Sequence, residues 1–309
     1  MKKSLVIIPQ RGIGDLIYHL PLLRSLYESY NQKLLILSNE VNHAKEVYKH
    51  ETFYEKIIYF ENTRFPLLKT LKTILNFRSL INQLDIEQLI LTGSPRRLII
   101  PVLLSNIKEK IIFGKGKFIF TKDKKYQNLT SSEKIMKYTE KLNLPIKNNN
   151  FFLSKIDENE IEKSKFKKRI FINLDSHHNQ NNWNINNFIK IIKEILLQNA
   201  RIYINFSPSK LFFLNMLPKE IISSEKVILT NKKTILEIIK IINSCEYIVS
   251  NESGPVCLGA SLKKEVHSIY IPIHTAPESK IINNKTFYYN VYEENDESIT
   301  KKILESVLK

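Results

Sequence analysis

Twice along this 309-residue chain, short apolar runs alternate with longer amphipathic stretches, and this alternation restricts the folds available to it. In the first half the apolar runs lie at 5–8, 34–37, 56–60, 88–92 and 110–113. Helical patterns lie at 15–30, 42–49, 67–84, 96–106 and 133–142. Strands that alternate with helices at this spacing form a parallel sheet covered by helices. We therefore predict an α/β unit for the first half.

The alternation restarts after a polar interval at about 145–168. Strands are predicted at 170–174, 201–206, 226–229, 247–249 and 266–271, with helices at 185–198, 210–217, 234–244, 256–262 and 296–308. A chain of this length can bury two cores. We predict an N-terminal domain at 1–150, a C-terminal domain at 165–290 and a C-terminal helix at 291–309.

The formal charge of +16, from 47 Lys and Arg against 31 Asp and Glu, has two readings. An anionic partner would explain it, and so would a compositional bias towards Lys, Asn and Ile. Nucleic acid is not favoured, because no aromatic-interleaved RNA motif or Cys/His finger spacing occurs. The apolar run at 98–104 is too short for a membrane helix, and the apolar residues before Gln10 are too few for a signal peptide. We expect a cytoplasmic protein.

The segment GIGDLIYHLP at 12–21 follows the first predicted strand. Gly12 and Gly14 begin a dinucleotide-binding pattern, and Glu40 could imitate its ribose-binding acid. However, the third glycine position holds Ile17, whose branched side chain hinders close helix–strand packing. Asp15 could instead be a helix-start acid, stabilised by the helix dipole by roughly 0.3–1 kcal/mol, or a catalytic base.

Two polar segments in the second half also follow predicted strands. Segment 248–262, IVSNESGPVCLGASL, places an acid, a hydroxyl and Gly254 at a strand end and then begins a helix. The free N–H groups of such a helix start can hold a diphosphate. Segment 175–183, DSHHNQNNW, ends in the only tryptophan. Ligands of parallel sheets bind beyond the carboxyl ends of strands, where all three segments should lie.

In order and spacing, the segments at 12–21, 175–183 and 248–262 resemble the glycosyltransferase family 9 heptosyltransferases of lipopolysaccharide core assembly. The resemblance covers nearly the whole chain. It implies a GT-B fold, with two facing Rossmann-like domains and a cleft between them. It implies inverting, metal-independent transfer of a heptose from ADP-heptose to a lipopolysaccharide core acceptor, without a cofactor. An anionic lipid-linked saccharide acceptor implies a peripheral location on an anionic surface, the inner face of the cytoplasmic membrane.

The resemblance also implies roles for residues. Asp15 matches the general base, which takes the proton of the acceptor hydroxyl as its oxygen attacks the anomeric carbon. The acceptor side would include Gly14, Arg96 and Arg97, although the two arginines could equally be solvated charge at a helix start. The donor would be held mainly by the second domain, at Asn181, Glu252, Ser253, Gly254 and Cys257.

Two of these positions depart from the family pattern. Cys257 replaces a histidine, and Asn181 stands where a lysine often offsets the charge of the diphosphate. His177, His178 or Lys210 could replace that cation. Two alternatives follow: a glycosyltransferase that uses another nucleotide sugar, and a catalytically lapsed relative that binds sugar nucleotides.

Two further readings of the cysteine and histidines are disfavoured. A metal site at His177, His178 and Cys257 is not favoured, since adjacent histidines seldom bind one ion. Cys257 as a nucleophile lacks a paired base, and a small packing residue explains it better.

Overall fold

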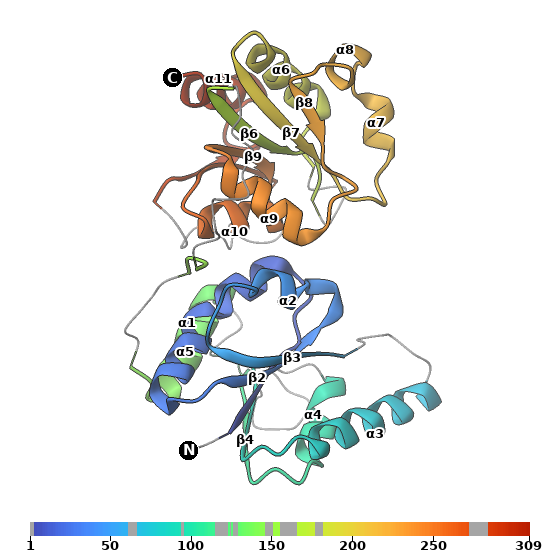
Figure 1. Ribbon diagram of the computed structural model, residues 1–309, viewed down its shortest axis with the longest axis vertical. Coiled ribbons are helices and arrows are strands. Elements are labelled where there is room, and N and C mark those ends of the chain that lie inside the picture. Colours follow the sequence, from blue (N-terminus) through green and yellow to red (C-terminus); the bar gives the residue numbers. More distant parts are fainter. Residues whose placement is uncertain are drawn as a thin grey trace. The chain divides into compact units, whose positions relative to one another are not determined.

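The computed structural model describes residues 3–60, 67–93, 96–114, 123, 125, 129–145, 151–154, 166–176, 182–271 and 284–309, without the side chains of 67–73 and 96–97. The chain divides into two compact units, Met1–Phe151 and Phe152–Lys309. Each unit contains a parallel sheet between layers of helices (Figure 1). In the part of the chain described here, no helix combines the length and the apolar character needed to cross a membrane.

In the first unit the described strands form a sheet in the order β3-β2-β1-β4-β5, and every pair is parallel. The strands are β1 (Ser4–Ile8), β2 (Leu34–Asn39), β3 (Tyr54–Phe60), β4 (Gln88–Leu91) and β5 (Glu109–Ile112). The chain adds β2 and β3 on one side of β1 and then returns to add β4 and β5 on the other. The direction of winding therefore reverses between β1 and β4.

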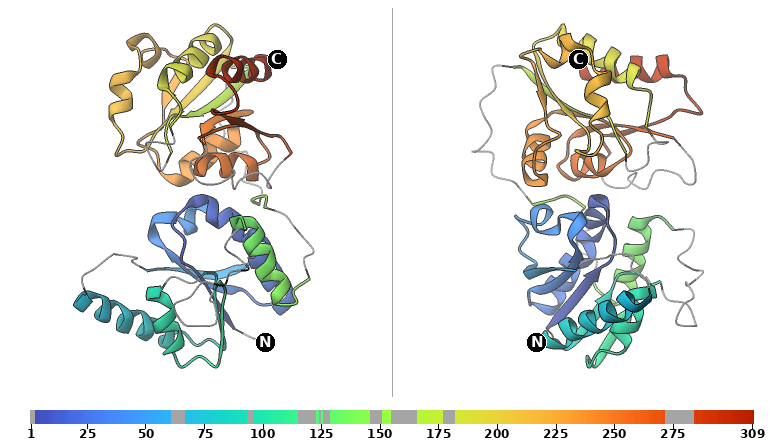
Figure 2. Two further views of the ribbon diagram at one scale, coloured as in Figure 1. Left: turned by 180° about the vertical axis from the view of Figure 1, so that it is seen from behind. Right: turned by 90° about the vertical axis from the view of Figure 1, so that its right-hand side faces the viewer.

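Helices cover both faces of this sheet (Figures 1 and 2). They are α1 (Ile13–Tyr30), α2 (Ala44–Val47), α3 (Leu67–Gln83), α4 (Arg96–Leu103) and α5 (Ser131–Lys141), with a 3-10 turn η1 (Glu40–Asn42) before α2. Helix α1 packs against α5, and α3 packs against α4. Alternate strand residues such as Leu5 and Ile7 pack with Phe77 of α3 and Val102 of α4. This follows from the two-residue period of strands, which sends neighbouring side chains to opposite faces.

In the second unit the order of the described strands is β11-β10-β9-β6-β7-β8, and every pair is again parallel. The strands are β6 (Lys168–Asn173), β7 (Ala200–Asn205), β8 (Val227–Leu229), β9 (Tyr247–Asn251), β10 (Glu265–Tyr270) and β11 (Thr286–Asn290). Winding reverses between β6 and β9. Strand β11 was not predicted, because four of its five residues are polar or tyrosine and the sequence shows no apolar alternation.

The helices of the second unit are α6 (Ile185–Leu196), α7 (Phe212–Met216), α8 (Lys219–Ile222), α9 (Ile235–Ser244), α10 (Gly254–Ser261) and α11 (Asp296–Val307). The main core joins the sheet to α6 and α11 through residues such as Ile172, Phe188 and Ile303. Helix α10 packs closely on the other face of the sheet. A Cβ on Gly259 would lie only 2.8 Å from the side chain of Ile248 in β9. The short α8 was not predicted.

Two parallel α/β units confirm the predicted α/β class. The predicted assignment of the acceptor to the first unit and the donor to the second remains a prediction.

Candidate functional site

In the first sheet the winding reverses between β1 and β4, and open parallel sheets bind ligands at such a position. At such a point the loops that follow two neighbouring strands diverge to opposite faces, here the loops after β1 and β4. Helix α1 starts in the first of these loops, and Asp15 and Gly14 lie in its first turn. Helix α4 starts after β4 with Arg96 and Arg97, whose side chains lie outside the described residues.

Asp15 is half-buried and acts as a helix-start acid. Its Oδ2 accepts a hydrogen bond from the backbone N–H of Gly12 across 3.1 Å. An acid in this turn is stabilised by the positive end of the helix dipole. Asp15 therefore has the role of helix-start acid that the sequence suggested. The hydrogen bond from Gly12 holds the carboxylate at the carboxyl end of β1, where the winding of the sheet reverses.

A buried histidine links the turn that carries Asp15 to the neighbouring strand. His19 is 1 % exposed. Its Nδ1 lies 2.6 Å from the carbonyl oxygen of Asp15, and its Nε2 lies 2.7 Å from Oγ1 of Thr92. A carbonyl oxygen only accepts, so Nδ1 carries a proton. Burial lowers the pKa of His19 to about 4, against a smaller upward effect of its bond to the Asp15 backbone. The neutral ring then accepts at Nε2 from the Thr92 hydroxyl.

In the second sheet the winding reverses between β6 and β9, and polar side chains meet there at the strand ends. Asn173, the last residue of β6, is buried. Its Nδ2 lies 3.2 Å from Oγ of Ser250 and 3.1 Å from Oγ of Ser253, both in or just after β9. The same nitrogen donates to the carbonyl oxygen of Asp175 across 2.5 Å. Asn173 thus joins the residues that follow β6 to those that follow β9.

This polar contact continues across the sheet towards β8. Asn205 of β7 donates from Nδ2 to Oδ1 of Asn173 across 2.8 Å. Thr230, just after β8, donates from Oγ1 to Oδ1 of Asn205 across 3.0 Å. A chain of side-chain hydrogen bonds therefore runs along the carboxyl ends of β8, β7, β6 and β9. Such buried networks are rigid when their members are satisfied.

Trp183, the last residue of the predicted polar segment, is held through its backbone N–H and through its indole. Oδ1 of Asn251 accepts from the backbone N–H of Trp183 across 2.8 Å, and its Nδ2 donates to the carbonyl oxygen of Leu174 across 2.7 Å. The indole Nε1 of Trp183 donates to Oδ1 of Asp296, in the first turn of α11, across 2.6 Å. Trp183 is buried and belongs to the core of the second unit.

The predicted donor residues at 252–257 surround the start of α10. Ser253 precedes the helix in extended conformation, and its hydroxyl donates to the carbonyl oxygen of Asn251 across 2.8 Å instead of capping the helix. Glu252 and Gly254 are half-buried beside it. Cys257 is 7 % exposed within α10, and neither cysteine forms a disulfide. The helix start thus offers partial positive charge and the backbone N–H of Gly254, because Pro255 has no N–H and that of Val256 donates to the carbonyl oxygen of Ser253 across 3.1 Å.

Lys210 brings a cation to this set of strand ends. It follows β7, and its Nζ donates to the carbonyl oxygen of Ser176 across 2.5 Å. The Nζ also lies 3.6 Å from Oδ2 of Asp175, which accepts from the N–H of Ser207 across 3.1 Å. The side chain of Lys210 is 14 % exposed. Asn181, His177 and His178 lie outside the described residues, so among the three replacement cations only Lys210 is located.

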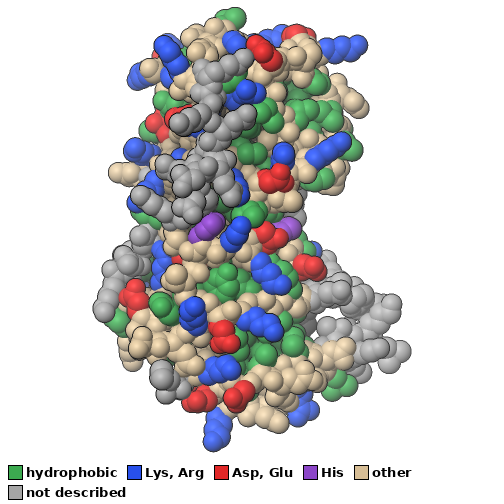
Figure 3. Space-filling view, in the orientation of Figure 1, with side chains coloured by type: hydrophobic (Ala, Val, Ile, Leu, Met, Phe, Trp, Pro, Cys, Tyr) green, Lys and Arg blue, Asp and Glu red, His purple; other side chains and the backbone are tan. Residues whose placement is uncertain are grey.

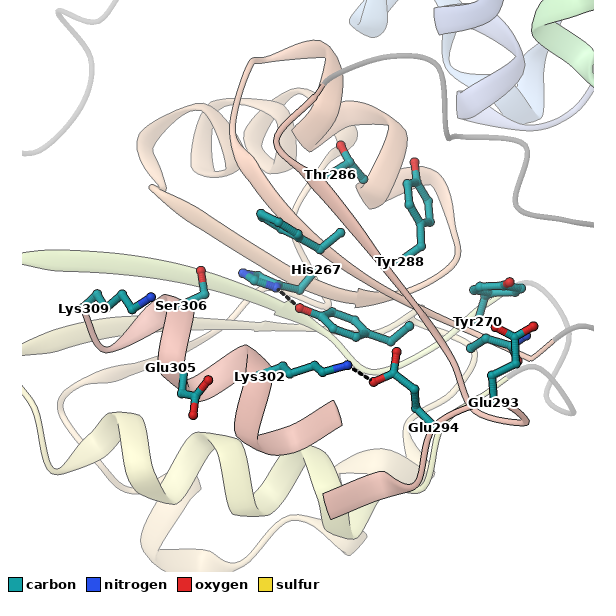
Figure 4. Close-up of a pocket in the computed structure, with 13 residues that line it drawn as sticks. His267, Tyr270, Thr286, Tyr288, Glu293, Glu294, Lys302, Glu305, Ser306 and Lys309 are labelled. Carbon is teal, nitrogen blue, oxygen red and sulfur yellow. Dashed lines mark hydrogen bonds and ion pairs between the residues drawn. The ribbon is translucent and has the colours of Figure 1, made fainter. Parts of the chain in front are cut away.

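A cavity of about 660 Å³ lies elsewhere, along the edge strand β11 and beside α11 (Figure 4). Its lining includes Tyr270, Phe287 and Lys302, and none of the described site residues named above. His267, at its wall, bonds through Nδ1 to the hydroxyl of Tyr289 across 2.9 Å. Open parallel sheets bind ligands at strand ends where winding reverses. We therefore place the candidate site at the two positions where winding reverses and not in this cavity.

Five residues described above were not predicted as site residues from the sequence: His19, Thr92, Asn173, Asn205 and Thr230. Two of these carry a local signal, since the strands at 169–173 and 201–205 read RIFIN and RIYIN and both end in asparagine. An asparagine that ends an apolar strand therefore indicates that polar side chains lie at the carboxyl end of that strand. His19 and Thr92 give no such signal, because only the pairing of β1 with β4 brings them together.

Comparisons with known proteins agree with this picture. The family model described as glycosyltransferase family 9 (heptosyltransferase) matches residues 120–304, more than half of the chain. No curated protein matches the chain.

Solved structures match over nearly the whole length. The glycosyl transferase family 9 structure from Veillonella parvula has a TM-score of 0.75 at 15% identity and covers 100% of this chain and 89% of its own. E. coli heptosyltransferase WaaC with ADP-2-deoxy-2-fluoro heptose has a TM-score of 0.75 at 12% identity and covers 98% and 99%. E. coli ADP-heptose lps heptosyltransferase II has a TM-score of 0.75 at 14% identity and covers 99% of this chain and 98% of its own. These likenesses confirm the GT-B fold class.

Proposed function

This chain belongs to glycosyltransferase family 9, and we propose that it transfers a heptose from ADP-heptose to a lipopolysaccharide core acceptor with inversion at the anomeric carbon. The proposed donor and acceptor rest on the sequence resemblance. The E. coli structure with ADP-2-deoxy-2-fluoro heptose supports an ADP-linked donor, because that protein shares the fold of this chain. The proposed transfer needs no metal ion, so EDTA should leave its rate unchanged.

In the proposed reaction Asp15 is the base. Its carboxylate takes the proton of an acceptor hydroxyl while the hydroxyl oxygen forms a bond to the anomeric carbon. The bond from that carbon to the diphosphate breaks on the opposite face, and the electron pair leaves with the nucleoside diphosphate. The proton stays on Asp15 until it passes to water. A half-buried carboxylate in the first turn of α1 is the observation that carries this assignment.

The leaving diphosphate gains negative charge, and the second unit offers groups that stabilise it. The start of α10 presents the backbone N–H of Gly254 and the positive end of its dipole, and we propose that Ser253 and Gly254 contact the donor there. Lys210 would supply the cation that Asn181 does not. Preorganised groups of this kind lower the barrier because they need no rearrangement as charge develops.

The test compares the full chain with its Asp15→Asn variant. We expect the variant to bind ADP-heptose with nearly unchanged affinity and to transfer heptose 10²–10⁴-fold more slowly, about the contribution of a general base. Transfer is measured with a lipopolysaccharide core acceptor, and binding by titration of the donor. Near-normal turnover would leave Asp15 as a helix-start acid alone.

A second candidate is transfer from another nucleotide sugar. Cys257 stands where the resemblance expects a histidine, and a thiol is a weaker hydrogen-bonding group than an imidazole. The UDP-GlcNAc 2-epimerase from Methanocaldococcus jannaschii also shares the architecture, with a TM-score of 0.56 at 15% identity. A thermal-shift panel separates the candidates: an ADP-linked sugar should raise Tm more than UDP-, GDP- or CMP-linked sugars. Donor binding without transfer to any acceptor would indicate the lapsed relative.

A further inference from the structure

His19 and Thr92 are two buried side chains that belong to neither the donor contacts nor the proposed base. We propose that they position Asp15, by tying the first turn of α1 to the end of β4. We call these two residues the β4 tie. The inference rests on the proposed function, in which Asp15 is the base.

The β4 tie reaches the backbone of Asp15 itself. The His19 ring lies one helical turn after Asp15, and its Nδ1 donates to the Asp15 carbonyl oxygen across 2.6 Å. On its other side Nε2 meets Oγ1 of Thr92 across 2.7 Å. One imidazole thus spans the distance from the helix backbone to a residue 73 positions away in the sequence.

Thr92 is a firm attachment point because it is bonded into the sheet. Its backbone N–H donates to the carbonyl oxygen of Ile7, at the end of β1, across 3.0 Å. Thr92 is fully buried, at 0% exposure. Its carbonyl oxygen accepts from Nε2 of Gln10 across 2.7 Å. Gln10 and His19 stand on either side of Asp15 in the sequence, and both bond to Thr92.

A further contact holds the same turn from the other side. The next carbonyl oxygen along the helix, that of Leu16, accepts from the hydroxyl of buried Tyr48 across 2.6 Å. The backbone that carries the Asp15 carboxylate is therefore fixed from two directions. Proton transfer requires the base within hydrogen-bond reach of the acceptor hydroxyl, and misplacement by about 1 Å can cost 10²-fold in rate.

The ring itself is not a second base. Nδ1 and Nε2 are both engaged within the unit, and the ring is 1 % exposed, which leaves no edge for a substrate hydroxyl. Burial lowers the pKa of His19 to about 4, so the ring stays neutral near pH 7. His19 is thus a positioning residue, which acts through Asp15.

The test uses variants that keep shape and remove one hydrogen bond. Thr92→Val removes the hydroxyl, and we expect kcat to fall about 10- to 100-fold with little change in donor Kd. Thr92→Ser keeps the hydroxyl and should retain most of kcat. Thr139→Val is the matched control. Thr139 is equally buried in the same unit, and its hydroxyl donates within α5, to the Ile135 carbonyl oxygen. Its kcat should equal that of the parent.

A double-mutant cycle with Asp15→Asn distinguishes positioning from a general loss of structure. With the base removed, Thr92→Val should cause no further loss of kcat. Equal losses in both backgrounds, or a Thr92→Val variant with parental kcat, would overturn the inference while Asp15 remains the base. Full activity of Asp15→Asn would overturn the inference and the proposed base together. Where Thr92→Val does not fold, His19→Phe serves in the same cycle, since its ring fills similar space and forms neither hydrogen bond.

Discussion

The backbone N–H of Gly12 donates to Oδ2 of Asp15 across 3.1 Å, and a Cβ atom on residue 12 would lie 2.9 Å from that same oxygen. The backbone of Gly12, with φ −85° and ψ 146°, is one that any residue adopts. Glycine is therefore needed here for space and not for conformational freedom. The absent side chain is what lets the carboxylate fold back onto the residue before the helix.

We expect Gly12→Ala to impair catalysis more than stability. The new methyl group displaces the end of a flexible side chain, so the fold can absorb it, but the Asp15 carboxylate must move. Turnover should fall by at least about tenfold, because a displaced base loses its alignment, while Tm changes little. Gly259→Ala is the contrasting variant. Its Cβ meets Ile248 at 2.8 Å within the core, and Tm should fall. A Gly12→Ala variant with parental turnover would show that the carboxylate position is not critical.

Lys210 provides a prediction about donor binding. Lys210→Met removes the ammonium group beside Asp175 and Ser176. If that group offsets the charge of the diphosphate, the donor Kd should rise about 10- to 100-fold, the value of a charged hydrogen bond. Lys210→Arg should recover part of the affinity. Lys233→Met is a suitable control, because Lys233 pairs with Glu237 at an exposed helix start. An unchanged donor Kd in Lys210→Met would assign Lys210 to loop structure alone.

The second unit should lose stability in mild acid because of His267. Burial lowers the pKa of this ring to about 4, against the upward effect of Glu265, whose Oε1 lies 3.3 Å from Nε2. The unfolded chain, with an ordinary pKa of 6.5, binds a proton that the folded ring does not. The contribution of His267 is therefore complete above pH 6.5 and is lost as pH falls towards 4. The loss amounts to roughly 3 kcal/mol.

Urea unfolding monitored by Trp183 fluorescence measures this effect, because the only tryptophan lies in the second unit. His267→Gln removes the titrating group, so the slope of unfolding free energy against pH should flatten between pH 6.5 and 4. An equally steep slope in that variant would assign the acid sensitivity to other groups.

The charge of +16 leads to a prediction about membranes. On the face in Figure 3, Lys and Arg side chains are spread over both units and do not gather in one patch. Co-sedimentation with anionic vesicles should be strong at low salt and largely lost near 1 M salt. The Debye length is about 10 Å at 0.1 M and about 3 Å at 1 M, so salt screens the attraction. Zwitterionic vesicles are the control. Binding that ignores salt, or no binding, would leave compositional bias as the source of the charge.

The sequence by itself determined the alternation of strands and helices, because burial on both faces of a parallel sheet requires continuous apolar runs and covering helices require a 3.6-residue period. It also placed Asp15 and Ser253 at helix starts, since a polar residue after a strand and before an amphipathic stretch is a local pattern. It missed β11, because an edge strand with the sequence TFYYN has no apolar run.

Only the tertiary structure decided which of these polar positions work together. Asn173 and Ser253 are 80 residues apart, and Asp175 and Lys210 are joined across neighbouring strands. His19 reaches Thr92 because β4 pairs with β1 and not with β3, which precedes it in the chain. Such partners are set by strand order, which depends on how whole helices and strands pack. A local pattern carries no information about strand order, since each strand can bury its side chains equally well beside several neighbours.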